Sequence, residues 1–185
     1  GTESFGIDNS QKYSSIGLFV ATDEEGGVVN RLMDTVGTTY IGSMYYYKDD
    51  GDETAYENAY TIANDMSALG FNLDFAPVAD VWSNPDNTVI GERAYSDDYA
   101  QAAELVGNAV KGFNDGGVMC TLKHFPGHGD TAEDSHYSSA YVHRTKEEIM
   151  ADEMQPFRSG IEAGAEFVPL WIPSQMNRLW QLLQT

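Results

Sequence analysis

The sequence has little cysteine, few basic residues and no long apolar run. Cys120 is the single cysteine among 185 residues, which excludes a disulfide framework and a cysteine-based zinc site within the chain. Ten lysines and arginines stand against 29 aspartates and glutamates, which gives a formal net charge of −19. Nucleic acids and anionic membrane surfaces require a basic protein face, so we expect neither as a partner. No stretch approaches the ~20 apolar residues of a membrane helix, so we expect no membrane span.

The length and composition are those of a globular protein. At about 100–200 residues per domain, 185 residues correspond to about one domain. Hydrophobic residues make up 42% of the chain and aromatic residues 12%, which is enough to form a core. We interpret residues 1–15 as a leader or linker, without the charged and apolar regions of a signal peptide. The compartment stays open, although the acidic composition favours the cell envelope or exterior slightly over the cytoplasm.

Apolar runs alternate with helical patterns from residue 16 onward. Short apolar runs that end in glycine or polar residues predict strands at 16–22, 71–78 and 118–123, and a further strand that begins at 166–170. Periodic apolar positions predict helices over 54–69, 96–113 and 145–163, the last opened by a capping box at Thr145 and Glu148. This alternation indicates a parallel α/β fold, and both a doubly wound sheet and a (β/α)8 barrel are compatible with it.

The end of the chain differs in style from the rest. Residues 169–185 contain no acidic side chain but have two prolines and two tryptophans. One interpretation is an amphipathic last helix. The other is that the native sequence stops near Val168, through truncation or a shifted reading frame, and we favour this second interpretation weakly.

The densest polar cluster follows the predicted strand at 118–123. Three of the four histidines lie here, and a metal site is one interpretation, with His124, His128, Asp130 and His136 as ligands. Pro126 and the neighbouring glycines exclude a helical pair of ligands, and the spacing matches no standard zinc pattern, so we assign no metal. A plainer alternative is that the histidines bond the backbone of a turn.

A different interpretation of the same cluster is a sugar or acyl-transfer site. Asp134 lies two residues before His136, and a carboxylate can fix the tautomer of a histidine and prepare it for general acid/base work. Lys123 and His124 would donate hydrogen bonds to substrate hydroxyls. The sequence has no Gly-x-Ser-x-Gly motif, so a serine hydrolase is unsupported.

The scarce basic residues and a run of tyrosines are further candidates. Arg31, Arg93 and Lys123 lie near the ends of the predicted strands. For any one of them a structural ion pair with the abundant carboxylates is the simpler explanation. The run Tyr45–Tyr47 could stack on a sugar ring, although such runs more often pack or form interfaces.

Four motifs, in this order, resemble one family. Asp23-Glu-Glu-Gly-Gly27 with Arg31, Phe75-Ala-Pro-Val78, Asn87-Thr-Val-Ile-Gly91 with Arg93, and Lys123-His-Phe-Pro-Gly-His-Gly129 with Asp134-Ser-His136 are their sequences here. Together they are similar to the family 3 glycoside hydrolases, in the β-N-acetylglucosaminidase (NagZ-like) branch. The resemblance covers residues 16–168, and the histidine motif is its most specific part.

The resemblance implies a fold, a reaction and a set of site residues. The fold would be a (β/α)8 barrel, here a partial one over 16–168. The reaction would be retaining hydrolysis of terminal β-N-acetylglucosamine from a glycan, either a peptidoglycan fragment or a chitin oligomer. The implied sugar-binding residues are Asp23, Arg31, Arg93, Lys123 and His124. His136, paired with Asp134, would be the catalytic acid/base, and no cofactor or metal is implied.

Departures from the family pattern limit what we expect of this chain. Val28 and Glu24 stand where the family often has arginine and glutamine. In the family, the nucleophile is an aspartate on a later strand. We find no segment in this chain that matches that strand, so we assign no nucleophile here. A complete barrel needs ~250 residues. We therefore expect the parent protein to be the enzyme, this chain to be inactive alone, and its uncovered sheet edges to favour self-association.

Three alternatives stay open. The chain could be a carbohydrate-binding or regulatory module without catalysis. It could come from a family 3 β-glucosidase, although the Asp-Ser-His sequence favours the glucosaminidase branch. It could also be a metal-dependent hydrolase that uses the histidine cluster.

Overall fold

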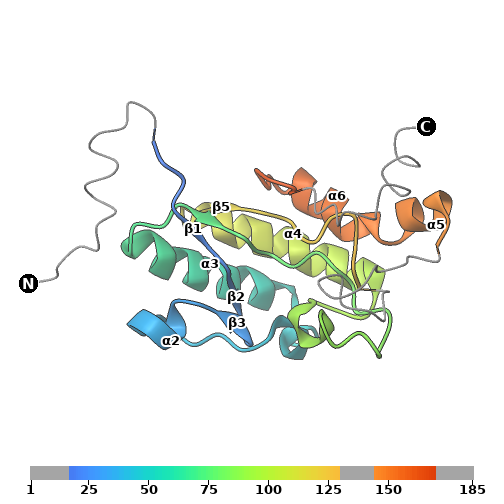
Figure 1. Ribbon diagram of the computed structural model, residues 1–185, viewed down its shortest axis with the longest axis horizontal. Helices are drawn as coiled ribbons and strands as arrows, with labels where there is room; N and C mark the ends of the chain where they lie inside the picture. The colour runs from blue at the N-terminus through green and yellow to red at the C-terminus, as the bar shows by residue number, and fades with distance from the viewer. Residues whose placement is uncertain (1–16, 130–143, 170–185) are drawn as a thin grey trace, which may run out of the picture.

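Helices packed on a small parallel sheet make up most of the molecule (Figure 1). The computed structural model describes residues 17–129 and 144–169. The sheet has the strand order β1-β4-β5, and both strand pairs are parallel. Its strands are β1 (Ala21–Thr22), β4 (Leu73–Asp74) and β5 (Met119–Cys120). A parallel bridge between Thr121 and Phe167 adds the beginning of a fourth strand. The predicted parallel α/β class is therefore confirmed.

The backbone hydrogen bonds between the segments of β4 and β5 continue beyond the ends of these two short strands. The Thr121 N–H donates to the Ala76 carbonyl at 2.8 Å, and the Ala79 N–H donates to the Lys123 carbonyl at 2.6 Å. Pro77 interrupts the regular ladder between these bonds because it has no N–H to donate. The segments predicted at 71–78 and 118–123 thus run side by side to the point where Lys123 leaves the sheet.

Two long helices lie within three residues of the bounds predicted for them, 54–69 and 96–113. They are α3 (Asp52–Ala68) and α4 (Tyr99–Asp115). The side chain of Asp98 caps α4 by accepting from the Gln101 N–H at 2.9 Å, which fixes where the helix starts. Glycine follows at 116, and α4 ends there. These boundaries come from local signals, which explains why they could be predicted.

The single helix predicted over 145–163 is wrong, because two helices lie there. They are α5 (Lys146–Ala151) and α6 (Met154–Glu162). The capping box of Thr145 and Glu148 opens α5 as expected. Pro156 explains the break, since its ring would clash with the Asp152 carbonyl in a continuous helix and it has no N–H to donate there.

The core lies where α3, α4 and α6 pack beside one another and against the sheet (Figure 1). Met66, Phe113 and Phe157, one from each helix, are at most 1% exposed. Gly112 lets α3 and α4 approach closely, because a Cβ at that position would lie 2.3 Å from the Tyr56 carbonyl oxygen. No helix in the described part of the chain is long and apolar enough to cross a membrane.

A hairpin and several short helices were not predicted. The antiparallel strands β2 (Glu24–Gly26) and β3 (Val29–Asn30) follow β1 directly. The short helices are α2 (Met33–Val36), η1 (Met44–Tyr47) and η2 (Gly91–Arg93). Gly27 has φ +57°, and a Cβ there would lie 2.1 Å from Ser43 Oγ, so the hairpin turn needs glycine. The hairpin places the residues after β1 beyond the carboxyl end of the sheet.

Candidate active site

The two faces of the sheet differ in polarity. Cys120 and Leu122 belong to the core cluster under the helices. Thr121 and Lys123 alternate with them and therefore point to the opposite face, although both are buried. Buried polar side chains thus gather on the side of the sheet that faces away from the helices.

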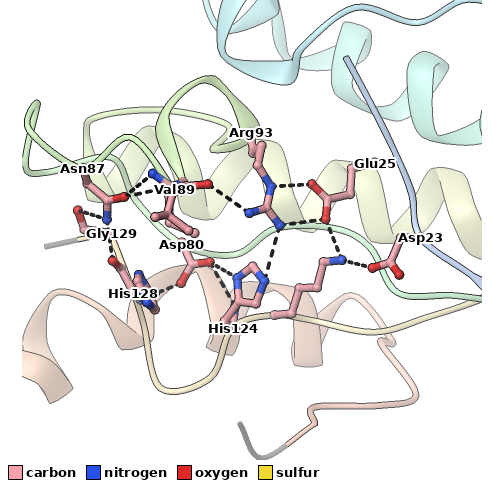
Figure 2. Close-up of polar contacts among 11 residues, drawn as sticks. Asp23, Glu25, Asp80, Asn87, Val89, Arg93, His124, His128 and Gly129 are labelled. Carbon is pink, nitrogen blue, oxygen red and sulfur yellow. Dashed lines mark hydrogen bonds and ion pairs between the residues drawn. The ribbon is translucent and has the colours of Figure 1, made fainter. Parts of the chain in front are cut away.

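Glu25 is the centre of the polar cluster (Figure 2). Arg93 holds its carboxylate with two bonds, from Nε to Oε2 at 2.8 Å and from Nη2 to Oε1 at 2.9 Å. Lys123 Nζ lies 2.5 Å from Glu25 Oε1. The carboxylate is 3% exposed, so it needs these two cations to offset its loss of hydration.

Lys123 links Glu25 to a carboxylate that reaches solvent. Its Nζ is 2.5 Å from Asp23 Oδ1, and the Asp23 side chain is 41% exposed. Arg93 and His124 are partly exposed on the same cluster, at 16% and 22%. The accessible edge of the cluster therefore offers one acceptor and several donors side by side.

Asp80 fixes the orientation of His124 (Figure 2). Its Oδ2 contacts the ring Nδ1 of His124 at 2.5 Å and accepts the backbone N–H of His124 at 3.0 Å. Its Oδ1 accepts the N–H of His128 at 2.7 Å. Burial alone would raise the pKa of Asp80, but the facing imidazole and these hydrogen bonds hold the pKa below its ordinary value. Asp80 stays ionised, and Nε2 of His124 points toward Arg93 Nη2 at 3.4 Å.

Asn87 ties the turn at residues 124–129, called the histidine turn below, to the loop that carries Arg93. Its Nδ2 donates to the carbonyls of His128 at 2.7 Å and Gly129 at 3.3 Å. Its Oδ1 accepts the N–H of Ile90 at 2.9 Å, next to η2. A Cβ at Gly129 would lie 1.5 Å from the Val81 carbonyl oxygen, so this contact requires glycine.

The structure brings together four of the seven predicted site residues, which are Asp23, Arg93, Lys123 and His124. Arg31 is exposed, and its backbone N–H donates to Glu24 Oε2 at 2.6 Å. Among the described residues, no hydrogen bond or ion pair joins its side chain to the cluster. Asp134 and His136 lie outside the described residues.

Three residues of the cluster were not predicted as site residues. They are Glu25, Asp80 and Asn87. Glu25 and Asp80 come three and two residues after predicted apolar strands, and a carboxylate at such a place was the available signal. Asn87 belongs to a quoted motif, but no local pattern indicates that its amide reaches a turn 41 residues away.

The described part of the chain contains no group of three or more histidine, cysteine, aspartate or glutamate side chains arranged to hold a metal. His124, one of the suggested ligands, is engaged with Asp80 through Nδ1. Asp130 and His136, two of the four suggested ligands, lie outside the described residues.

Comparison with known proteins identifies the family to which this chain belongs. Residues 2–172 match the N-terminal domain of glycosyl hydrolase family 3. The match covers most of the chain, so the chain belongs to this family.

Individual members of the family show which of its proteins this chain is similar to. The chain is 39% identical over 156 residues to "Beta-hexosaminidase A" of Pseudoalteromonas piscicida, covering 83% of this chain and 26% of that protein. A family 3 β-N-acetylglucosaminidase from Paenibacillus sp. str. FPU-7 is similar in structure, with TM-score 0.82, 40% identity, and coverage of 88% of this chain and 31% of that one.

A second solved structure is similar at a lower sequence identity. It is NagZ from Neisseria gonorrhoeae in complex with N-trifluoroacetyl-D-glucosamine, with TM-score 0.79 and 32% identity. The match covers 89% of this chain and 49% of that one. The chain thus spans from about a quarter to about half of the length of the proteins it matches.

Proposed function

We propose that this chain is the sugar-binding part of a retaining β-N-acetylglucosaminidase. The observation that carries the proposal is the cluster in which Lys123 and Arg93 share the buried Glu25 beside the exposed Asp23. Three of the similar proteins are named β-hexosaminidase, β-N-acetylglucosaminidase and NagZ, which supports this reaction over others in the family.

The cluster suits a sugar because its donors and acceptors are fixed before binding. A pyranose ring presents hydroxyls that both donate and accept. Asp23 would accept from one hydroxyl, while Lys123 and the Nε2 side of His124 would contact its neighbours. Glu25 and Asp80 restrain the basic groups, so little side-chain freedom is lost on binding. In this proposal Arg31 contacts the substrate from the rim.

The proposed chemistry uses residues beyond the cluster. His136, with Asp134 to orient it, would protonate the leaving group and later activate water. A retaining mechanism also needs a nucleophile that forms a glycosyl-enzyme intermediate. We assign no residue of this chain to that role, and we propose that the parent polypeptide supplies it.

We further propose that the sheet is part of a (β/α)8 barrel. Phe19, just before β1, contacts Phe167 at the opposite edge, with ring centroids 5.6 Å apart. Across a flat sheet these edges would be about 14 Å apart, at ~4.8 Å per strand. The contact therefore favours a sheet that curves toward closure. The partner would be a β-N-acetylglucosamine-terminated glycan, from peptidoglycan or chitin.

Hydrolysis of an aryl β-N-acetylglucosaminide tests the proposed function. The protein would be a polypeptide extended to the length of the relatives, with the aryl β-glucoside as the second substrate. We expect turnover of the acetylated sugar only, and a loss of at least 100-fold on the substitution His136→Ala, since acid/base catalysis contributes about 10²–10⁴-fold. His143→Ala is the matched control and should retain activity.

Other outcomes support the alternatives. Turnover that prefers the β-glucoside would indicate the β-glucosidase branch. Activity that is lost with a chelator and restored by a metal ion would indicate the metal-dependent hydrolase. If a folded, extended protein binds N-acetylglucosamine and turns over neither substrate, the chain is a binding module. The 185-residue chain by itself should bind the sugar without turnover.

A further inference from the structure

A further buried carboxylate lies beside the site and takes no part in the polar cluster around Glu25. Glu153, at the start of α6, is 4% exposed. Its Oε1 accepts hydrogen bonds from the Tyr99 hydroxyl at 2.9 Å and from Arg144 Nη1 at 3.0 Å. Tyr99 is the first residue of α4, so Glu153 joins the beginnings of two helices.

Arg144 extends this group of side chains. It also pairs with Asp152, at the junction of α5 and α6, and lies 5.5 Å from the centre of the Tyr99 ring. The guanidinium is therefore shared between two carboxylates and an aromatic face. Glu153 is held in one position from several directions.

The side of Glu153 away from these partners faces the histidine turn. A Cβ at Gly127 would lie 3.0 Å from Glu153 Oε2 and 3.2 Å from Glu153 Cβ, so the glycine rests directly on this side chain. Gly127 closes the turn by donating its N–H to the His124 carbonyl at 2.8 Å. The Phe125 ring packs edge-on against Phe157 of α6 at 5.4 Å. The first turns of α6 therefore support the segment that carries His124.

We propose that Glu153, held by Tyr99 and Arg144, is a positioning residue that supports the turn under Gly127 and so keeps His124 against Asp80 and Arg93. This role rests on the proposed function, because it concerns the histidine assigned to the sugar. Glu153 itself touches none of the residues that we expect to contact substrate. It acts through the backbone of the turn.

The charge of Glu153 makes its role depend on pH. The pKa of Glu153 is raised to about 7, because burial, with a smaller contribution from the Asp80 charge, outweighs the lowering effect of Tyr99 and Arg144. The other ionisable groups near it are Asp152, which shares Arg144, and Asp80 with the two imidazoles of the turn, His124 and His128. The carboxyl group therefore changes charge near neutral pH while it is in contact with the turn.

Nuclear magnetic resonance of the ¹⁵N-labelled 185-residue chain tests the proposal. In the wild-type chain we expect the amide signals of Gly127 and His124 to shift between pH 5.5 and 8.5 with a midpoint near 7. The substitution Glu153→Gln keeps the shape of the side chain but removes its ionisable carboxyl group. The part of the amide shift that has its midpoint near pH 7 should therefore vanish. Glu148→Gln removes a carboxylate from the neighbouring helix and should leave it in place.

Binding of N-acetylglucosamine to the same proteins provides the second readout. Tyr99→Phe removes one hydroxyl that holds Glu153, and we expect the affinity to fall severalfold. Tyr56→Phe is the matched control, because the Tyr56 hydroxyl donates to Asp115 at 2.9 Å on the outer side of α3 and α4. This control should not change the affinity.

The results separate the two proposals. If the pH-dependent component persists in Glu153→Gln and Tyr99→Phe binds the sugar as wild type does, Glu153 is not a positioning residue. If no protein binds N-acetylglucosamine, the proposed function fails, while the amide signals still decide whether Glu153 acts on the turn.

Discussion

Glu25 is a buried carboxylate whose ion-pair partners lie far away in the sequence. Arg93 lies 68 residues after it, and the two groups form a bidentate pair. Removal of one partner of a buried pair leaves a charge without compensation, which is far more destabilising than the loss of an exposed pair. At the residue scale, removal of one partner of this pair should therefore lower stability as well as weaken sugar binding.

Arg93→Ala should destabilise the chain by roughly 2–4 kcal/mol, somewhat below the range for a fully unpaired buried charge, because Lys123 still faces Glu25. Urea unfolding at pH 7 measures this. The control is Lys48→Ala, which breaks an ion pair with Asp97, whose side chain is 50% exposed. It should change the free energy of unfolding by less than about 1 kcal/mol. Equal effects of the two substitutions would contradict the importance of burial.

Asp74 lies on β4, and its burial leads us to expect that the stability of the chain depends on pH. Burial raises the pKa of Asp74 well above its ordinary value, although the Glu24 N–H donates to its Oδ1 at 3.0 Å. Its Oδ2 has no hydrogen-bond partner among the described residues. The folded chain therefore keeps a proton that the unfolded chain releases above its pKa of about 4. Stability should fall as the pH rises through the interval between the two values.

Asp74→Asn removes this titration and keeps the acceptor for the Glu24 N–H. We expect the variant to be more stable than wild type at pH 7, with a smaller difference near pH 4. Urea unfolding of both proteins across this range measures the effect. Parallel curves, separated by a constant amount, would show that Asp74 does not titrate in this way.

At the scale of elements, α4 shows where local propensity and packing disagree. Alanine is favoured over glycine inside a helix by about 1 kcal/mol, so the sequence alone suggests that Gly112→Ala would stabilise it. The packing of α3 predicts the reverse. A Cβ at Gly112 would lie 2.3 Å from the Tyr56 carbonyl and 2.9 Å from the Tyr60 nitrogen, and backbone cannot move aside easily.

Gly112→Ala should therefore destabilise the chain by about 1–3 kcal/mol, the usual range for overpacking. Thermal and urea unfolding measure the change. Glu104→Ala, at an exposed position of the same helix, should stay within about 0.5 kcal/mol of wild type. A more stable Gly112→Ala variant would mean that α3 and α4 can separate without loss.

At the scale of the whole molecule, apolar side chains remain exposed along the sheet. The Phe19 residue is 62% exposed, Phe75 is 38% exposed and Phe167 is 36% exposed. Open sheet edges and exposed aromatic rings favour contacts between chains. We expect the 185-residue chain to self-associate, and Phe19→Ser to reduce the association. Light scattering over a range of concentrations measures both, and a clean monomer of the wild-type chain would contradict the expectation.

The sequence by itself determined the order of the main strands and helices, the parallel α/β class, the ends of α3 and α4 to within three residues, and the polar groups at the ends of the strands. These features follow from apolar periodicity and capping residues, which act over a few positions. The break before α6 also has a local cause, Pro156, which the prediction of one helix over 145–163 overlooked. The tertiary structure decided the hairpin after β1, the exposed position of Arg31, and the partners of Glu25 and Glu153. Those depend on which distant segments the sheet and helices bring into contact, and short-range patterns in the chain carry no record of such contacts.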